Sequence, residues 1–475
     1  MELGRWSSRQ YGLLCVLAGN MLIDALEVSA AIVLLPRLRA DLDRPLATAQ
    51  WVMSGFALGF GGLMPFGRQV VALLGRRRVY LASLLFFAAA SVLGALTRDP
   101  LLLVATRFVK GFCAALAAPT GLAIIGTAFE EGPARNRALS VYMLFGACGF
   151  TAGLLLSGLL TGVGWRWTFL FPSPIVLVLF TIALYILPAE HPPGEARLRL
   201  DIAGACTFIA ALVALVHAIV SLPGHDWTEP RTLRAFALAA VLFGAFVLVE
   251  RRAAEPLIRV SLLAHRTLIR SALGAAALNG SYLGFLLILT FHFQSLAGWS
   301  PLRTALALLP ASAPLAATSW WAGRVVSRLG AARLIAMGAS LPPMGYAFYD
   351  LRLRFPLTYT ADVFPALLLV GAGFVLAFAA LNVQATSGVP AAARGAAVGL
   401  YQTAVQLGAT VVIALVTALL GRSSAAFDAS DGAHASIYRP ALHLVTAIGA
   451  LGFIVALGGV LSTRAEGAPV ARRPS

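Results

Sequence analysis

Long apolar runs follow one another along the whole chain, each separated from the next by a short polar or turn-forming stretch. A helix needs about 20 mostly apolar residues to cross the hydrocarbon core of a bilayer, and a helix satisfies its own backbone polar groups in lipid. The pattern therefore predicts an all-α polytopic membrane protein with 14 transmembrane helices. The expected spans are 11–36, 48–73, 79–97, 101–126, 137–162, 167–187, 202–221, 233–250, 268–292, 303–322, 331–350, 361–385, 396–420 and 441–462.

The arginines of the connecting loops indicate an orientation. An even number of spans places both termini on one side of the membrane. If that side is the cytoplasm, about 21 arginines fall in inner loops and tails and about 12 fall outside, which is the bias expected of cytoplasmic loops. We therefore expect a multi-pass protein of the cell membrane with both termini cytoplasmic. Arg76 and Arg77 follow the second span, where they either latch an inner gate or only set this topology.

An internal repeat occurs at an offset of 255 residues and predicts the domain organisation. The matching pairs are Val70–Gly75 with Val325–Gly330, Gly153 with Gly408, and Asp24 with Asn279. A parallel repeat of this kind is a recurrent transporter plan, with the substrate site between the halves near the bilayer midplane. We expect a six-helix bundle in residues 1–190, two inserted helices in 191–266, and a second six-helix bundle with a short polar tail in 267–475.

Composition narrows the possible functions. Hydrophobic residues make up 59% of the 475 positions and charged residues 12%, which no ordinary soluble protein shows. The net charge of +16 would suggest nucleic-acid binding in a soluble protein, but loop-end arginines account for it here, so no nucleic-acid partner is expected. The four cysteines have no disulfide or metal spacing, and no phosphate-binding glycine loop occurs. We expect neither an enzyme nor an ATP-driven pump, and neither a cofactor nor a metal.

Two acids near the middle of the first span match two bases in the fourth. Asp24 and Glu27 are three residues apart and share one helix face, as do Arg107 and Lys110. Counted from the outer ends, Glu27 and Arg107 lie about 9–10 residues deep, and Asp24 and Lys110 about 12–13. A charge at membrane depth costs at least about 2.5–3.5 kcal/mol, so it faces a partner or a water-filled cavity. The spacing predicts that the two acids and two bases meet inside the bundle.

Two interpretations of these charges stay open. In one, an acid gains and loses a neighbouring cation as the halves rock, and therefore binds and releases a proton. In the other, a static buried ion pair locks the first span to the fourth. Lys110 is the only lysine in the chain. It either neutralises Asp24 or makes the cavity more positive, which would favour neutral or anionic substrates.

Polar and aromatic residues inside other spans are candidates for a substrate cavity. Aromatic rings with a few polar groups suit amphiphilic, drug-sized ligands, although each residue could instead form a hydrogen bond between helices. The candidates are Asn20, Tyr142, Asn279, Tyr282, His292, Gln294, Asn382, Gln384, Gln402 and Gln406.

Several motifs along the chain carry a family resemblance. The motifs are Gly75–Arg78 after the second span, Arg107–Gly111 continuing to Pro119, the glycines Gly149, Gly153 and Gly158, Trp165–Phe169, and the stretches Leu200–Gly204 and Glu250–Leu257 around the extra helix pair. Together they resemble the motifs of the major facilitator superfamily, in particular its fourteen-helix drug:proton antiporter branch, and the resemblance covers nearly the whole chain. Three positions depart from the family pattern: Ala72 replaces an aspartate, Leu154 a proline and Ser157 a glycine.

The resemblance implies roles for individual residues. Glu27, nine residues before Pro36, aligns with the acid of the family's first helix. Arg107 would be its fixed counter-charge, or alternatively a bridge to backbone carbonyls at a helix bend. The family more often has glutamine where Lys110 stands. The glycines of the fifth span would form a bend between the halves where rocking is sensed, although they could serve packing alone.

The expected function is a proton-coupled secondary exporter of lipophilic small molecules, either drugs or a self-made metabolite, that works by alternating access. Its partners would be a small-molecule substrate, protons and the lipid bilayer, and a monomer is expected. One alternative keeps the fold and drops the coupling, giving a facilitator or uniporter. A third hypothesis is a non-transporting membrane sensor or scaffold, which is disfavoured because paired buried charges are costly to keep without a use.

Overall fold

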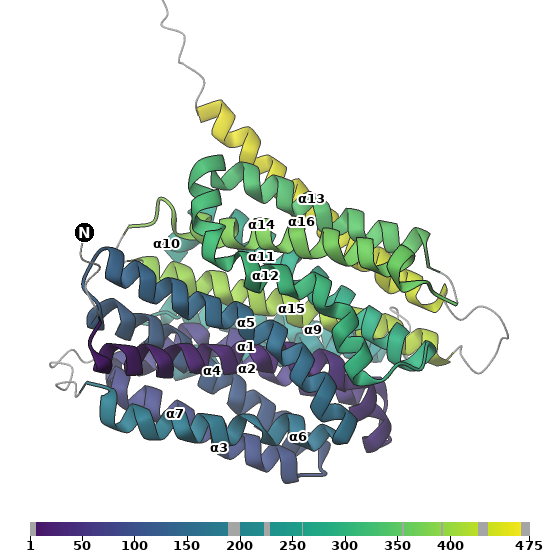
Figure 1. Cartoon of the computed structure of the whole chain (residues 1–475), viewed down its shortest axis with the longest axis horizontal. Coiled ribbons are helices and arrows are strands. Elements are labelled where there is room, and N and C mark those ends of the chain that lie inside the picture. The colour runs from purple at the N-terminus through teal and green to yellow at the C-terminus, as the bar shows by residue number, and fades with distance from the viewer. Residues whose placement is uncertain are drawn as a thin grey trace, which may run out of the picture.

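The computed structural model is all-helical (Figure 1), and it describes residues 6–188, 200–222, 229–258, 260–353, 356–390, 393–425 and 436–466. Within these residues, 12 helices are long and apolar enough to cross a membrane. They are α1 (Ser8–Leu42), α2 (Leu46–Leu74), α3 (Arg76–Leu96), α4 (Pro100–Ala128), α5 (Pro133–Val163), the continuous pair α6 (Trp165–Leu170) and α7 (Pro172–Ile186), α8 (Ile202–Val220), α9 (Pro230–Arg252), α11 (Arg266–Phe291), α14 (Phe364–Thr386), α15 (Arg394–Ala425) and α16 (Arg439–Glu466).

The expected count of fourteen spans is not confirmed. Helices form in the other two predicted segments, as α12 (Pro301–Leu329) and α13 (Ala331–Leu351), but neither belongs to the 12 apolar helices found in the described residues. Both carry two internal prolines. In addition, α12 contains three arginines and α13 contains an arginine and an aspartate.

The helices fall into two groups that meet along two helix pairs. Among the first seven, α1 packs against α5 and α7, and α4 packs against α2 and α3. Among the last six, α11 packs against α15 and α16, and α13 against α14 and α16. Figure 1 shows these groups as the purple-to-blue and the green-to-yellow parts of the molecule. Contacts between α5 and α12 and between α2 and α15 join them. The predicted domain boundaries stay a prediction.

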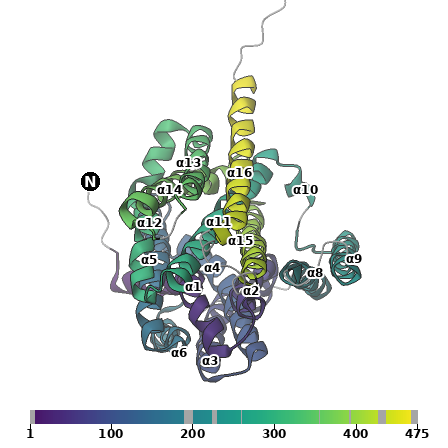
Figure 2. The same ribbon diagram turned by 90° about the vertical axis from the view of Figure 1, so that its right-hand side faces the viewer.

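The helices α8 and α9 lie at one side of the molecule (Figure 2), where α8 packs against both α2 and α15. Gln69 of α2 forms hydrogen bonds with the chain just before α8 and just after α9. Its side-chain nitrogen donates to the carbonyl of Glu255 at 2.7 Å, and its oxygen accepts from the backbone N–H of Asp201 at 3.0 Å. The segment that follows α9 is thereby held beside α2. It leads through α10 (Val260–Leu263) into α11.

The first helix is well defined at both ends. Ser7 caps its start, because its hydroxyl accepts the backbone N–H of Gln10 while the Gln10 side chain accepts the N–H of Ser7. Its end is marked by Asp43, which adopts a left-handed conformation with φ 47°. The helix between is 35 residues long and carries both predicted acids on its buried face.

Candidate functional site

A buried three-residue ion cluster joins α1 to α4. The carboxylate of Glu27 accepts from the guanidinium of Arg107 on one oxygen and from the ammonium of Lys110 on the other, the latter at 2.5 Å. Arg107 also donates to two carbonyl oxygens at 3.1 Å, those of Glu27 and Val52. All three side chains are at most 4% exposed. Both interpretations offered for Arg107, as a counter-charge and as a bridge to backbone carbonyls, therefore describe contacts that it makes.

Close helix packing and aromatic rings surround this cluster. Gly59 of α2 and Gly111 of α4 each face the backbone of the other helix so closely that a Cβ atom would clash with it. This approach brings Arg107 within reach of the Val52 carbonyl. The guanidinium lies 4.9 Å from the ring centre of Phe56, and the Lys110 ammonium lies 4.8 Å from that of Phe87. Such contacts stabilise cations that have lost their water.

Asp24 is separate from the cluster. Its carboxylate accepts a hydrogen bond from the side chain of Asn20 at 3.1 Å, and it lines the central cavity. The expectation that Lys110 neutralises Asp24 is not met at the level of contacts, because the ammonium binds Glu27 instead. Lys110 is 0% exposed and is not part of the cavity lining. The idea of a lysine that makes the cavity surface positive therefore finds no support in its position.

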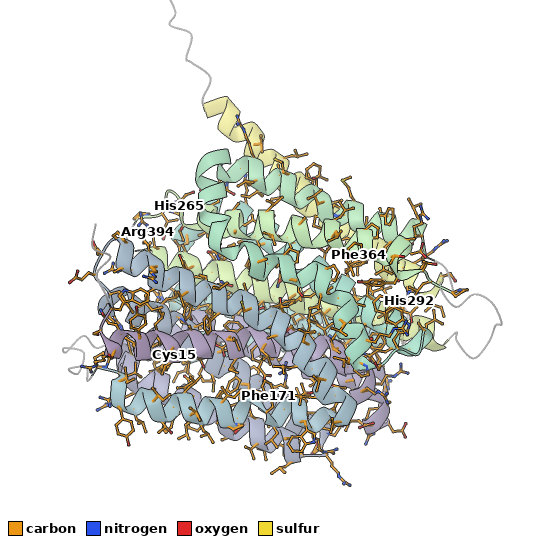
Figure 3. All side chains as sticks on the ribbon, viewed as in Figure 1. Cys15, Phe171, His265, His292, Phe364 and Arg394 are labelled. Atoms are coloured by element: carbon orange, nitrogen blue, oxygen red, sulfur yellow. The ribbon has the colours of Figure 1, made fainter. Side chains whose placement is uncertain are left out.

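The cavity has a volume of about 1370 Å³ and extends from the middle of the bundle to one end. At that end it is bordered by Gly75 and Arg76 after α2 and by Gly395 and Ala396 at the start of α15. Figure 3 labels the neighbouring Arg394 and His265 at this end, and His292 and Phe364 towards the other. A space of this size, lined largely by apolar side chains, suits a drug-sized ligand.

At the opposite end the two helix groups are in contact. Gln294, in the π-helical turn His292–Leu296 after α11, donates to the carbonyl of Val33 in α1 at 2.9 Å. A Cβ atom on Gly158 of α5 would come within 2.6 Å of the Cβ of Ala305 in α12. Side chains and backbone fill this region. The cavity is therefore closed at this end and reaches only the other end of the bundle.

Five of the predicted cavity residues do line it: Tyr142, Asn279, Tyr282, Gln402 and Gln406. Three of them also bind backbone carbonyls on neighbouring helices, namely Tyr142 to Ala118, Asn279 to Val405 and Tyr282 to Ala311, each at 3.2 Å. These three residues therefore both line the cavity and form hydrogen bonds between helices, the two roles that the sequence left open. Asn382, another candidate from the sequence, also lines the cavity.

Four predicted cavity residues lie elsewhere. Gln294 binds Val33 at the closed end, and the side-chain oxygen of Gln384 accepts a hydrogen bond from the Ser271 hydroxyl at 3.2 Å. Asn20 is buried against Asp24 and does not line the cavity. His292 lies at the closed end, where its ring forms a hydrogen bond with the hydroxyl of Tyr349 and stacks on Tyr438 with centroids 5.1 Å apart. Its helix position alone could not show this, because a polar residue near a helix end can face either the cavity or a neighbouring helix.

The cavity also contains residues that sequence reasoning missed. Four phenylalanines line it, one each from α2 and α5 and two from α14, together with three residues that follow α9: Phe60, Phe150, Phe374, Phe378, Leu257, Ile258 and Leu262. The chain contains 27 phenylalanines, so nothing in the sequence distinguishes these four. For the segment after α9, the sequence does offer a signal in the family-like stretch Glu250–Leu257, but the resemblance associates that stretch only with the extra helix pair.

The predicted glycines of α5 pack against other helices. Gly149 and Gly153 face the backbone of Leu22 and Leu26 in α1 without room for a Cβ atom. Gly158 faces α12 in the same way. Arg76 lies at the open end of the cavity and donates to the hydroxyl of Thr127 at 3.4 Å, whereas Arg77 donates to the carbonyl of Leu184 at 2.8 Å.

Across the part of the chain that the structure describes, no group of three or more His, Cys, Asp and Glu side chains is placed to hold a metal ion.

Comparison with known proteins shows which family has this arrangement. A family model described as Major Facilitator Superfamily matches residues 17–413. The puromycin resistance protein pur8 of Streptomyces alboniger is 32% identical over 427 residues, which is 89% of this chain and 84% of that protein. The cephamycin export protein CmcT of Amycolatopsis lactamdurans is 31% identical over 415 residues, covering 86% and 84%.

Solved structures of the same fold are more distant in sequence. The nucleoside transporter NupG superposes with a TM-score of 0.63 at 12% identity, covering 95% of this chain and 99% of that one. The 12 apolar helices and the relatives indicate a multi-pass membrane protein. The superfamily consists of transporters of small molecules rather than enzymes, and the relatives include antibiotic and multidrug resistance proteins. The chain therefore belongs to the Major Facilitator Superfamily.

Proposed function

We propose that the protein is a proton-driven exporter of lipophilic small molecules. The observation that carries this proposal is a large, mostly apolar cavity, closed at one end, with a carboxylate in its lining and a buried ion cluster three residues away. The named activities of the relatives support export of antibiotic-like compounds. The candidates for proton coupling are Asp24, Glu27 and Arg107.

The proposal includes a membrane orientation. With both termini in the cytoplasm, the end at which Gly75 and Gly395 border the cavity faces the cytoplasm, and the conformation is inward-facing. Cargo would enter from the cell interior. Rocking of the two helix groups about α5–α12 and α2–α15 would then open the other end.

We also propose that α12 and α13 cross the membrane, which gives fourteen spans in two six-helix halves with α8 and α9 inserted. Their lengths of 29 and 21 residues support this, as does the packing of α12 against α5 and α14 and of α13 against α14 and α16. Prolines and charges are tolerated in a span when neighbouring helices cover them. We also propose that the protein works as a monomer.

Transport by the purified protein in liposomes tests the function. Puromycin and a cephamycin are suitable cargoes because relatives carry those names, and a pH-sensitive dye reports proton movement. The proposal predicts that an imposed pH gradient accelerates cargo movement and that cargo in turn moves protons. Cargo movement that ignores the gradient would favour the uncoupled facilitator. No movement of any cargo in a broad panel would favour the sensor or scaffold.

A further inference from the structure

The wall of the cavity that the last six helices supply differs in chemistry from the wall opposite. The charged residues of the described lining all come from α1, α2 and the start of α3: Asp24, Arg68 and Arg76. The described lining from α11 to α15 contains no charged side chain. On α14 and α15 it contains three side-chain amides instead: Asn382, Gln402 and Gln406.

These three amides have no hydrogen-bond partner among the described residues. The neighbouring Asn279, by contrast, donates to the carbonyl of Val405 at 3.2 Å. Gln406 is only 7% exposed and still lines the cavity. Each side-chain amide offers two donors and an acceptor oxygen, and buried amides that join helices are hydrogen-bonded to them. The three amides are therefore placed to bind a ligand rather than a neighbouring helix.

The amides follow one another inward from the open end of the cavity. At 1.5 Å per residue, Asn382 lies about 6 Å from the end of α14. Gln402 and Gln406 lie about 12 Å and 18 Å from the start of α15, where Figure 3 labels Arg394. Gln402 and Gln406 are one turn apart and share a face of α15. We call Asn382, Gln402 and Gln406 the amide row.

Open space and an aromatic ring adjoin the amide row. A Cβ atom on Gly399, three residues before Gln402, would meet no atom within 4 Å. On α14, Phe378 lines the cavity one turn before Asn382, and its ring stacks on that of Phe374 with centroids 5.0 Å apart. The space beside the row can therefore take a flat apolar group whose polar substituent reaches the amides.

We propose that the amide row is a substrate subsite that recognises the uncharged amide group of an aromatic substrate, as a carboxamide, lactam or urea. This inference rests on the proposed function and names a substrate class for it. An amide N–H donates to the side-chain oxygens of the row, and an amide carbonyl accepts from their NH₂ groups. A ligand that lacks the donor displaces water from the row and leaves oxygens unpaired, which is unfavourable. The recognition needs no charge on the ligand.

Binding of two matched ligands to the purified full-length protein tests the proposal. N-methylpyrene-1-carboxamide and methyl pyrene-1-carboxylate have nearly the same shape and the same carbonyl acceptor, but only the first has an N–H donor. We expect the amide to bind about fivefold or more tightly than the ester. In Gln402→Leu, the affinity for the amide should fall to within about twofold of that for the ester. Pyrene fluorescence reports binding, with protein-free micelles as the blank.

Two further variants make the result specific. Gln384→Leu removes an amide of α14 that bonds to Ser271 and is not part of the described lining, so the wild-type preference for the amide ligand should remain. Gly399→Leu fills the open space beside Gln402 and should weaken both ligands by about fivefold or more. Unchanged binding of the ester to Gln402→Leu shows that this variant is folded.

Equal affinity of the wild type for the two ligands would overturn the inference, as would a preference for the amide that is undiminished in Gln402→Leu. Failure of the proposed function gives a different result. Liposomes would then show no gradient-driven cargo movement, while the purified protein still prefers the amide to the ester.

Discussion

The four ionisable side chains near the middle of α1 and α4 balance one another in number but not in contact. Two acids and two bases give a formal sum of zero, yet both bases bind Glu27 and neither binds Asp24. Helical spacing correctly predicted that opposite charges meet between these helices. It could not predict the pairing, because Lys110 has a long flexible side chain that can reach either acid. The rings of Phe87 and Phe169, which come from other helices, lie next to its ammonium.

The ion cluster leads to a prediction about stability at the residue scale. Arg107→Ala removes a cation from Glu27 and also the hydrogen bonds that the guanidinium donates to the carbonyls of Glu27 and Val52. Breaking a buried pair in this way costs roughly 3–5 kcal/mol. We expect a clearly lower unfolding temperature in detergent, measured by intrinsic tryptophan fluorescence.

Lys110→Met is the matched comparison, since it leaves Glu27 paired with Arg107 and replaces the buried lysine stem with an apolar chain of similar length. This variant should unfold at a temperature closer to that of the wild type. An equal loss in both variants would show that the two cations contribute equally to the structure.

At the scale of elements, α5 is the helix that packs closely against members of both helix groups. Its Gly149 and Gly153 face α1, and its Gly158 faces α12. The hydroxyl of Ser157, which stands where the family pattern has glycine, donates to the carbonyl of Ala30 at 2.7 Å. The departure from the motif is therefore compensated by a direct bond between α5 and α1. Gly162, by contrast, has no atom near the position of a Cβ.

This difference within one helix gives a matched pair of substitutions. Gly153→Val places methyl groups where Ser29 and the backbone of Leu26 lie, and such overpacking costs about 1–3 kcal/mol. Gly162→Val introduces the same residue at the open position. The first variant should show reduced yield of monodisperse protein and a lower unfolding temperature than the second. If both variants behave alike, close α1–α5 packing does not limit stability.

At the scale of the whole molecule, the cavity is open at one end and closed at the other. Residues from α1, α2, α4, α5, α11, α12, α14 and α15 line it, and the segment after α9 closes one side. The hydrogen bond of Gln69 to Glu255 holds that segment to α2. The segment that follows α9 thus contributes to the wall of the cavity.

The one-ended cavity predicts a difference in chemical accessibility. In a background with the four cysteines replaced by alanine, Gly399→Cys would place a thiol on the cavity wall, where no other atom crowds it. Ala305→Cys would place one in the closed end, where Ala305 is 0% exposed. A membrane-impermeant maleimide should label the first faster by about tenfold or more in inside-out vesicles. Faster labelling of Gly399→Cys from the outer face would reverse the proposed orientation.

Local signals in the sequence were sufficient for the helices, the family and the buried charges. Apolar runs of span length determine helices because lipid offers the backbone no hydrogen bonds, and the motifs Gly75–Arg78 and Arg107–Gly111 indicate the superfamily. The count of spans was less secure, because α12 and α13 mix apolar residues with prolines and charges, and such a helix depends on its neighbours for cover.

Tertiary structure alone decided which side chains share a space. Asn279 on α11 and His292 in the turn that follows it are both polar residues of one predicted span, yet His292 packs on Tyr438 at the closed end and Asn279 lines the cavity. Asp24 and Glu27 differ by less than one helical turn, yet one faces the cavity and the other faces two cations. A periodic sequence determines which face of a helix is buried. The side chains and charges that this face contacts belong to helices far away in the chain, so only the tertiary structure decides them.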